Sequence, residues 1–263
     1  MVELHSSLAP PAPWTLAIGI PLVMGALAWA LRVVRRSAFL AGVPAGVLVL
    51  KLGGLAGFLV LTAFFLLGTA LTRFGFSAKE ARGVAEEAGG RRGASHVLAN
   101  CGLGLLLLIA GAVFGITGAI SRVSAAGTDE VGATGAVLLW AAFVGSFATA
   151  ASDTSSSEIG QLYGRHPISL RTFRPVPIGT QGAVSLEGLL AGLAAAGIMA
   201  GVGRAVGFLD GWGWVAVTAG GFLGNVMESL AGTWGRRFLP HGLLNFTNTA
   251  VGATLAAALT ALR

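Results

Sequence analysis

Charged side chains are scarce in this chain. Only 11% of its 263 residues are Asp, Glu, Lys or Arg, whereas a soluble domain averages about 25%. Hydrophobic residues make up 54% of the chain, and the mean hydropathy is +0.79. This shortage of charge argues against an ordinary soluble domain and predicts a membrane protein.

Several kinds of reactive motif are also missing. A single cysteine, Cys101, excludes an intramolecular disulfide. The four histidines show no metal-ligand spacing, and we expect them to be interfacial or solvated. There is no Ser-His-Asp pattern, and no glycine-rich loop has the Gly-Lys-Ser/Thr ending of a P-loop. The basic residues form no aromatic-interleaved stripe, so a nucleic-acid binder is not expected.

Long apolar segments dominate what is present. A spanning helix needs about 20 mainly apolar residues, and the 41 glycines suit close packing of such helices. The tract 37–70 is too long for one span, so we divide it at a turn over Lys51–Gly54. The sequence predicts an all-α bundle of about eight spans (six to eight), in a single membrane domain over 1–263. The predicted segments are Trp14–Leu31, Ser37–Leu50, 55–70, His96–Ile120, Ala133–Ser152, Gly182–Gly203, Trp214–Ala231 and Leu243–Leu262.

The basic residues predict how these spans are oriented. Thirteen of the 17 Lys and Arg fall in loops after the first, third, fifth and seventh segments: Arg32, Arg35, Arg36, Arg73, Lys79, Arg82, Arg91, Arg92, Arg165, Arg171, Arg174, Arg236 and Arg237. The other four are Lys51, Arg122, Arg204 and Arg263. Because cytoplasmic loops carry the excess of positive charge, we expect a multi-pass cell-membrane protein with both termini outside. The long loops, about 73–95 and 153–181, are then cytoplasmic.

A weak internal repeat accompanies these spans. Gly57-Phe-Leu59 with Gly68-Thr69 matches Gly221-Phe-Leu223 with Gly232-Thr233 at the same spacing. We interpret this as recurring helical hairpins, an arrangement in which membrane proteins often place a site at the repeat interface.

Two carboxylates separated by hydroxyl side chains occupy the end of the fifth segment. Asp153 and Glu158 flank Thr154-Ser-Ser-Ser157. Mg²⁺ is usually held by one or two protein carboxylates together with substrate phosphates, so this pair is a candidate magnesium site. The alternative is a polar helix end without a metal.

Guanidinium groups and glycines surround that pair in the sequence. Arg171 and Arg174 precede Gly179-Thr180, at the predicted start of the sixth segment, and Lys79 precedes Gly90-Arg-Arg92. Arginine offers paired donors to phosphate oxygens, and a helix N-terminus can bind an anion. Membrane topology alone would also place arginine here, and that interpretation stays open.

Glu228 is a carboxylate inside a predicted span. Gly220 and Gly224 lie eight and four residues before it, on one helix face. A charge at mid-span costs about 2.5–3.5 kcal/mol on insertion scales, and such residues are functional candidates. Asn225 in the same span, and Asn100, Asn245 and Asn248 in other spans, add further polarity. The alternative is an interhelical hydrogen bond without a catalytic role.

A family resemblance rests on these same residues. Gly89-Gly-Arg-Arg-Gly93 with Asn100, Asp153-Thr154 with Glu158-Ile-Gly160, Pro177 with Gly179-Thr180, and Asn245 with Asn248 occur in a characteristic order. Over about residues 35–262 the chain resembles the phytyl-phosphate kinase family of multi-pass membrane proteins. It departs from the family pattern at Glu228, where an aspartate is expected.

The resemblance implies transfer of a phosphoryl group from a nucleotide, CTP, to an isoprenyl monophosphate such as phytyl phosphate. Asp153 and Glu158 would hold Mg²⁺, and Arg91, Arg92, Arg171 and Arg174 would bind phosphates. Lys79, Gly90, Asn100, Gly179, Thr180, Glu228, Asn245 and Asn248 would complete the substrate site. A transporter or lipid flippase is the alternative, because intramembrane carboxylates and repeats are typical of transporters too. The sequence leaves the oligomeric state open, a homo-oligomer included.

Overall fold

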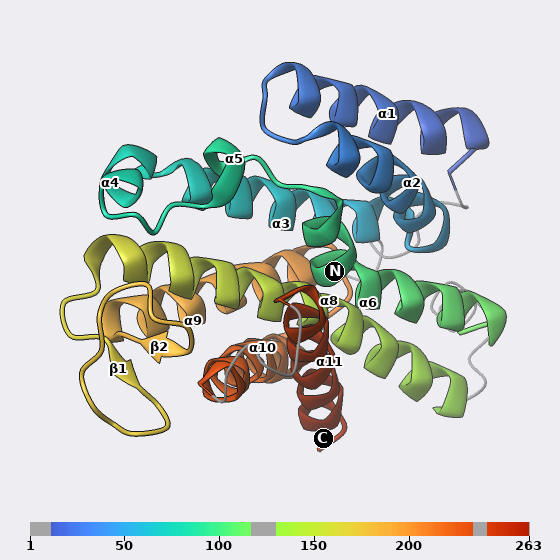
Figure 1. The fold of residues 1–263 in the computed structure, drawn as a ribbon. Coiled ribbons are helices and arrows are strands. Elements are labelled where there is room, and N and C mark those ends of the chain that lie inside the picture. The colour runs from blue at the N-terminus through green and yellow to red at the C-terminus, as the bar shows by residue number, and fades with distance from the viewer. Residues whose placement is uncertain (1–11, 117–129, 234–240, 263) are drawn as a thin grey trace.

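The computed structural model describes residues 12–116, 130–233 and 241–262. Eight long helices correspond in order to the eight predicted segments (Figure 1). They are α1 (Trp14–Ala30), α2 (Arg36–Leu52), α3 (Gly54–Arg73), α6 (Ala94–Val113), α8 (Glu130–Tyr163), α9 (Leu186–Ala205), α10 (Gly211–Gly232) and α11 (His241–Thr260). Shorter elements are α4 (Phe76–Ala81), α5 (Glu87–Gly90) and the antiparallel pair β1 (Ile168–Ser169) and β2 (Ala183–Val184).

The predicted all-α membrane architecture is confirmed. Within the described residues, four helices are long and apolar enough to cross a membrane by length and composition: α3, α6, α8 and α9, with α8 counted from Thr134. Helix α1 is apolar but shorter. That all eight helices cross the bilayer, and the repeat between hairpins, stay predictions.

The turn expected at Lys51–Gly54 is present. Helix α2 ends at Leu52 and α3 begins at Gly54, whose φ of +63° is in the left-handed region that favours glycine. The second segment is therefore a 17-residue helix of its own.

Helix α8 differs from its prediction. The sequence analysis ended this segment at Ser152 and expected a loop from residue 153, but the helix continues to Tyr163. Its 34 residues extend about 50 Å at 1.5 Å per residue. The hydroxyl-rich continuation stays helical because it packs beside α9, where the Gly188 Cα lies near Gly160.

Helix α8 is also the centre of the bundle. It contacts α3, α6, α9, α10 and α11, and every residue from Trp140 to Ser152 is buried. Trp140 stacks on Phe208 with ring centroids 3.9 Å apart. Figure 1 shows α10 nearly end-on while α8 and α9 run across the view, so α10 crosses this pair at a steep angle.

Two glycines let α8, α10 and α11 approach closely. A Cβ atom on Gly252 would lie 1.9 Å from Thr149 Oγ1, and one on Gly220 would lie 2.5 Å from the backbone nitrogen of Ala256. Larger side chains at either position would push the backbones apart. This is the small-residue packing by which helices associate in lipid.

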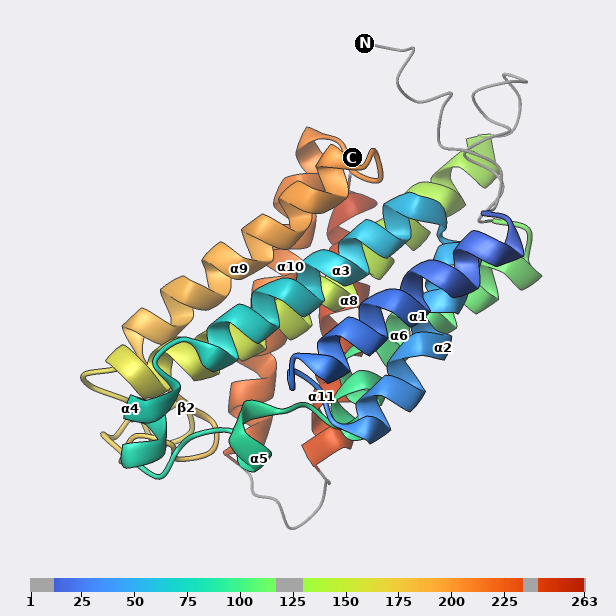
Figure 2. The ribbon, with the colours of Figure 1, turned by 90° about the horizontal axis from the view of Figure 1, so that it is seen from above.

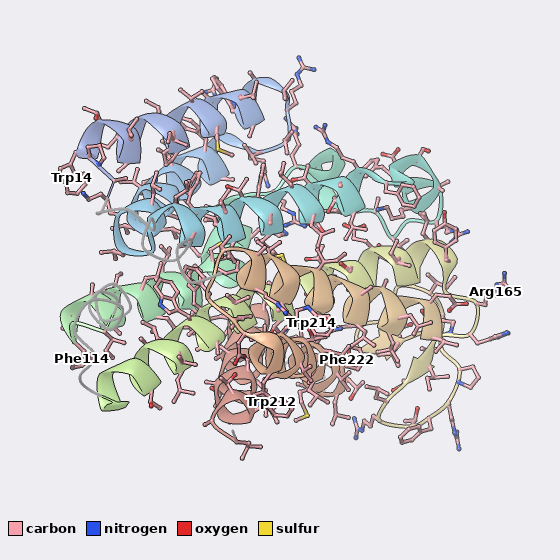
Figure 3. The ribbon with its side chains drawn as sticks, turned by 180° about the vertical axis from the view of Figure 1, so that it is seen from behind. Trp14, Phe114, Arg165, Trp212, Trp214 and Phe222 are labelled. Atoms are coloured by element: carbon pink, nitrogen blue, oxygen red, sulfur yellow. The ribbon has the colours of Figure 1, made fainter. Side chains whose placement is uncertain are left out.

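Most of the basic loops gather at one end of the long helices, here named the basic end and comprising residues 31–35, 74–93 and 164–185. Figure 2 shows α4, α5 and β2 at this end, with the start of α1 and the end of α11 toward the opposite end. Arg165 and Trp14 lie at opposite sides of the bundle in Figure 3. Arg122, Arg236, Arg237 and Arg263, part of the predicted charge asymmetry, lie outside the described residues.

Candidate functional site

A cavity of about 300 Å³ opens at the basic end. Its wall combines the polar continuation of α8, the loop that precedes α9, and the last turns of α10. The polar residues that line it are Asp153, Ser156, Ser157, Gln161, Thr180, Gln181, Ser185, Asn225, Glu228 and Ser229.

Asp153 and Glu228 meet in this cavity. Their carboxyl groups are hydrogen-bonded to each other, and the amide of Asn248 donates to Glu228 Oε2. Two carboxylates in contact repel each other if both are charged. The pair therefore needs either a shared proton or a bound cation between the two groups.

Glu158 has a different partner. Its Oε2 lies 2.5 Å from Lys79 Nζ, and both side chains are almost fully buried. Lys79 also donates to the carbonyl oxygens of Leu71 and Thr72, at 3.1 and 2.9 Å. This pair fixes α4 against α8, and Glu158 is not part of the cavity wall.

Arg92 contacts the same part of α3 as Lys79 does. Its Nη2 donates to the carbonyl of Gly68 and to Thr72 Oγ1, both at 3.3 Å. Burial lowers the pKa of the Arg92 guanidinium, and the carboxylates of Glu158, Glu86 and Asp153 oppose that change. Asp153 is thus one of the carboxylates whose charge acts on the Arg92 guanidinium.

The other predicted arginines lie elsewhere. Arg91 is exposed and donates from Nε to the carbonyl of Ala88 at 3.0 Å, next to Gly90, whose φ is +73°. Arg171 and Arg174 are exposed in the loop between β1 and β2. In the described part of the chain none of these three arginines forms a salt bridge.

The loop before α9 reaches the cavity, although not as predicted. Gly179 and Thr180 line the cavity, but α9 begins at Leu186, where Ser185 Oγ accepts from the Gly188 amide at 3.2 Å. The expectation that 179–182 opens the helix is therefore wrong, because the chain first pairs as β2 over Ala183–Val184. The loop contributes to the site as a wall.

Asparagine side chains on α6 and α11 form hydrogen bonds inside the bundle. Asn245 Nδ2 donates to Asn100 Oδ1 at 3.4 Å. One turn further along α11, Asn248 is buried and reaches Glu228, and its own Oδ1 has no hydrogen-bond partner among the described residues. The structure thus pairs Asn100 with Asn245, and joins Asn248 to Glu228 and Asp153.

The sequence analysis noted Asn225 as polarity inside a span but did not assign it to the site. This side chain is 1% exposed, and its Nδ2 donates to Ser152 Oγ at 3.1 Å and Ser156 Oγ at 2.7 Å. It joins α10 to α8 beside the carboxyl pair. Its position three residues before Glu228, on the same helix face, is the signal that identifies it.

Comparison with known proteins identifies a family match and several relatives of this chain. The model of a family described as integral membrane protein DUF92 matches residues 19–238. An uncharacterised membrane protein of Synechocystis is 35% identical over 216 residues, covering 80% of this chain and 76% of that protein. The chloroplastic protein VTE6 of Arabidopsis thaliana is also 35% identical over 216 residues, covering 80% of this chain but 60% of VTE6.

An uncharacterised membrane protein of Methanocaldococcus jannaschii is 32% identical over 210 residues, covering 80% of this chain and 76% of that protein. No solved structure matches. These findings confirm the family resemblance drawn from the motifs. The chain belongs to the DUF92 family of integral membrane proteins.

Proposed function

We propose that this protein is a membrane kinase that transfers the γ-phosphoryl group of a nucleoside triphosphate, CTP, to an isoprenyl monophosphate such as phytyl phosphate. The observation that carries the proposal is the Asp153–Glu228 carboxyl pair in a polar cavity at the basic end of an apolar bundle. The relationship to VTE6 and the order of the motifs support the same activity.

The reaction needs no strong base from the protein. An oxygen of the acceptor phosphate attacks the γ-phosphorus, the bond between that phosphorus and the β-bridging oxygen breaks, and the nucleoside diphosphate leaves. The acceptor oxygen is already anionic, so the protein mainly positions the phosphates and neutralises their charge. The relevant side chains are therefore those that bind phosphate oxygens or a cation.

The residues in the cavity fit Mg²⁺. Among the described residues no group of three or more His, Cys, Asp or Glu side chains is arranged for a metal, which argues against a site built from protein ligands alone. Mg²⁺ instead takes one or two carboxylates and completes its coordination with phosphate oxygens and water. When bound, it would neutralise charge on the transferred phosphoryl group.

We assign Asp153 and Glu228 as the carboxylates for this cation. The sequence analysis paired Asp153 with Glu158, but the Glu158 carboxylate is already neutralised by Lys79. We propose that Glu158 and Lys79 position α4 and the loop that carries Arg92. The uncommitted Oδ1 of Asn248, beside Glu228, adds a further oxygen at this point.

The basic side chains around the cavity suit the phosphates. In this proposal Arg92 faces the acceptor phosphate, while Arg171, Arg174 and Arg91 are surface groups that bind the nucleotide when it arrives from solution. Gly179 and Thr180 offer backbone and hydroxyl groups from the loop wall. Asn225 holds the serines of α8 in place.

Purified protein in detergent tests the proposal directly. Mg²⁺-CTP and a series of isoprenyl monophosphates are supplied, and the isoprenyl diphosphate is quantified. Formation of the diphosphate supports the kinase assignment. Movement of lipid or solute across liposomes without nucleotide consumption would instead support the transporter or flippase.

A further inference from the structure

A second cavity, of about 140 Å³, lies among α1, α2, α3 and α6. Its lining is almost wholly apolar, and four phenylalanines contribute to it: Phe39, Phe58, Phe64 and Phe65. The exceptions to the apolar lining include Arg92 and His96, which precede and begin α6. The cavity is therefore apolar with basic groups among its wall residues, next to the basic end.

The Arg92 side chain is held at this boundary by the backbone around it. Arg92 forms a parallel bridge with Val34, and its carbonyl accepts from the Arg35 amide at 3.0 Å. Only Nη2 of the guanidinium is used in hydrogen bonds within the described residues. The Nε and Nη1 donors are left for an anion.

A chain of contacts links this cavity to the first one. Arg92 donates to the hydroxyl of Thr72, Lys79 donates to the carbonyl of Thr72, and Lys79 pairs with Glu158 on α8. The neighbouring Ser157 lines the cavity that holds Asp153. Arg92 thus lines the apolar cavity and is joined through Thr72, Lys79 and Glu158 to the helix that lines the polar one.

We infer that this second cavity binds the first part of the hydrocarbon chain of a lipid monophosphate, with the phosphate at Arg92. The inference rests on the proposed function and names where its acceptor binds. The apolar wall suits the chain, and the free guanidinium donors suit its phosphate. Pockets that enclose a drug-sized ligand hold about 300–1,000 Å³, so the remainder of a long chain lies outside, along the helices.

Two glycines provide a matched test. Gly42 on α2 and Gly19 on α1 both have open space beyond the Cα, since an added Cβ would meet nothing within 4 Å. Of the two, Gly42 lines the cavity and Gly19 does not. A Gly42→Phe side chain adds bulk in open space at a residue that lines the cavity, while Gly19→Phe adds the same bulk elsewhere. Both variants should keep the elution profile and melting temperature of the wild type.

The binding measurement uses a farnesyl monophosphate bearing a benzophenone, offered to the protein in nanodiscs without nucleotide. We expect Gly42→Phe to weaken competition by unlabelled farnesyl phosphate about tenfold or more, and Gly19→Phe to leave it unchanged. Mass spectrometry should place the crosslink in the wild type on α2, α3 or α6. Equal affinity of Gly42→Phe and wild type, or crosslinks confined to α9–α11, would overturn the inference.

The phosphate end is tested separately. Arg92→Gln should weaken farnesyl phosphate binding and leave binding of farnesol, which lacks the phosphate, unchanged; loss of both ligands equally would overturn the assignment of the phosphate. These outcomes are distinct from those for the kinase. If the protein forms the diphosphate but Gly42→Phe binds farnesyl phosphate normally, only the assignment of the second cavity is rejected. If the probe crosslinks to the second cavity but no nucleotide is turned over, only the kinase activity is rejected.

Discussion

The carboxyl groups of Asp153 and Glu228 are in hydrogen-bond contact although they come from different helices, α8 and α10. Such a contact is stable only with a proton or a cation between the two groups. Its place in the wall of the polar cavity makes it the centre of the proposed site.

Substitution of either member of this pair should stop phosphoryl transfer. Asp153→Asn and Glu228→Gln keep the size of each side chain but replace one carboxylate oxygen by an amide nitrogen and so remove the charge. We expect kcat/KM for isoprenyl phosphate to fall at least about 100-fold in each variant, because a cation held by this pair would stabilise the transition state by several kcal/mol. Glu187→Gln, a carboxylate at the start of α9 outside the cavity wall, is the control. Near-normal turnover in Asp153→Asn would refute the assignment.

Cation binding should be measurable without the reaction. Mn²⁺, a paramagnetic substitute for Mg²⁺, is titrated into the metal-free protein in detergent and followed by its electron paramagnetic resonance signal. The wild type should bind it in the presence of a non-hydrolysable CTP analogue, and the Asp153→Asn and Glu228→Gln variants should not. Retained binding in both variants would place the cation elsewhere.

The buried ion pair between Lys79 and Glu158 should behave as one unit. Removal of one partner of a buried pair costs about 3–5 kcal/mol, because the remaining charge is uncompensated. Lys79→Met and Glu158→Gln should therefore each lower the melting temperature more than the double variant does. A double-mutant cycle measures this coupling, and additive losses would show that the pair is not a unit.

The loop before α9, which forms part of the wall of the polar cavity, should depend on Gly182 for its position. The φ of this glycine is +72°, and an added Cβ would lie 2.6 Å from the carbonyl oxygen of Ser229 and 2.7 Å from the amide of Thr233, at the end of α10. Gly83 is the matched control, with a φ of +69° and open space beyond its Cα. Gly83→Ala should cost only backbone strain of about 1–2 kcal/mol. Gly182→Ala should cost more and raise KM for the nucleotide, since it displaces the cavity wall. Equal effects of the two variants would refute the role of close packing here.

The orientation of the chain can be read by cysteine labelling. Cys101 is buried and is the sole cysteine, so Cys101→Ala provides a cysteine-free background. On that background Ser77→Cys, exposed on α4, should be labelled by a membrane-impermeant maleimide only after the cells are opened. Phe114→Cys, exposed at the far end of α6, should be labelled on intact cells. The reverse pattern would invert the predicted topology.

The positions of the helices could be predicted because hydrophobicity is a local property. The turn at Lys51–Gly54 and the order of eight segments both follow from stretches of sequence read alone. The end of α8 could not, because the continuation from Asp153 to Tyr163 is polar and stays helical through its packing on α9.

The composition of the site could be predicted better than its pairings. Asp153, Glu228, Gly179 and Thr180 line one cavity as a set. The sequence offered Glu158 as the partner of Asp153 because the two are close in the chain. On a helix, however, residues five apart point in different directions. The partner of Glu158 is Lys79, on the short helix α4, which no local pattern connects to it.

The length of α8 has a consequence for the membrane around it. About 50 Å of helix cannot lie within a hydrocarbon layer of about 30 Å, so its depth is set by where apolar side chains give way to Asp153 and the serines. A thicker bilayer draws that boundary toward the lipid, and a thinner one leaves it in water. Turnover should therefore vary with acyl-chain length in reconstituted vesicles, because this boundary on α8 carries Asp153, one member of the proposed site.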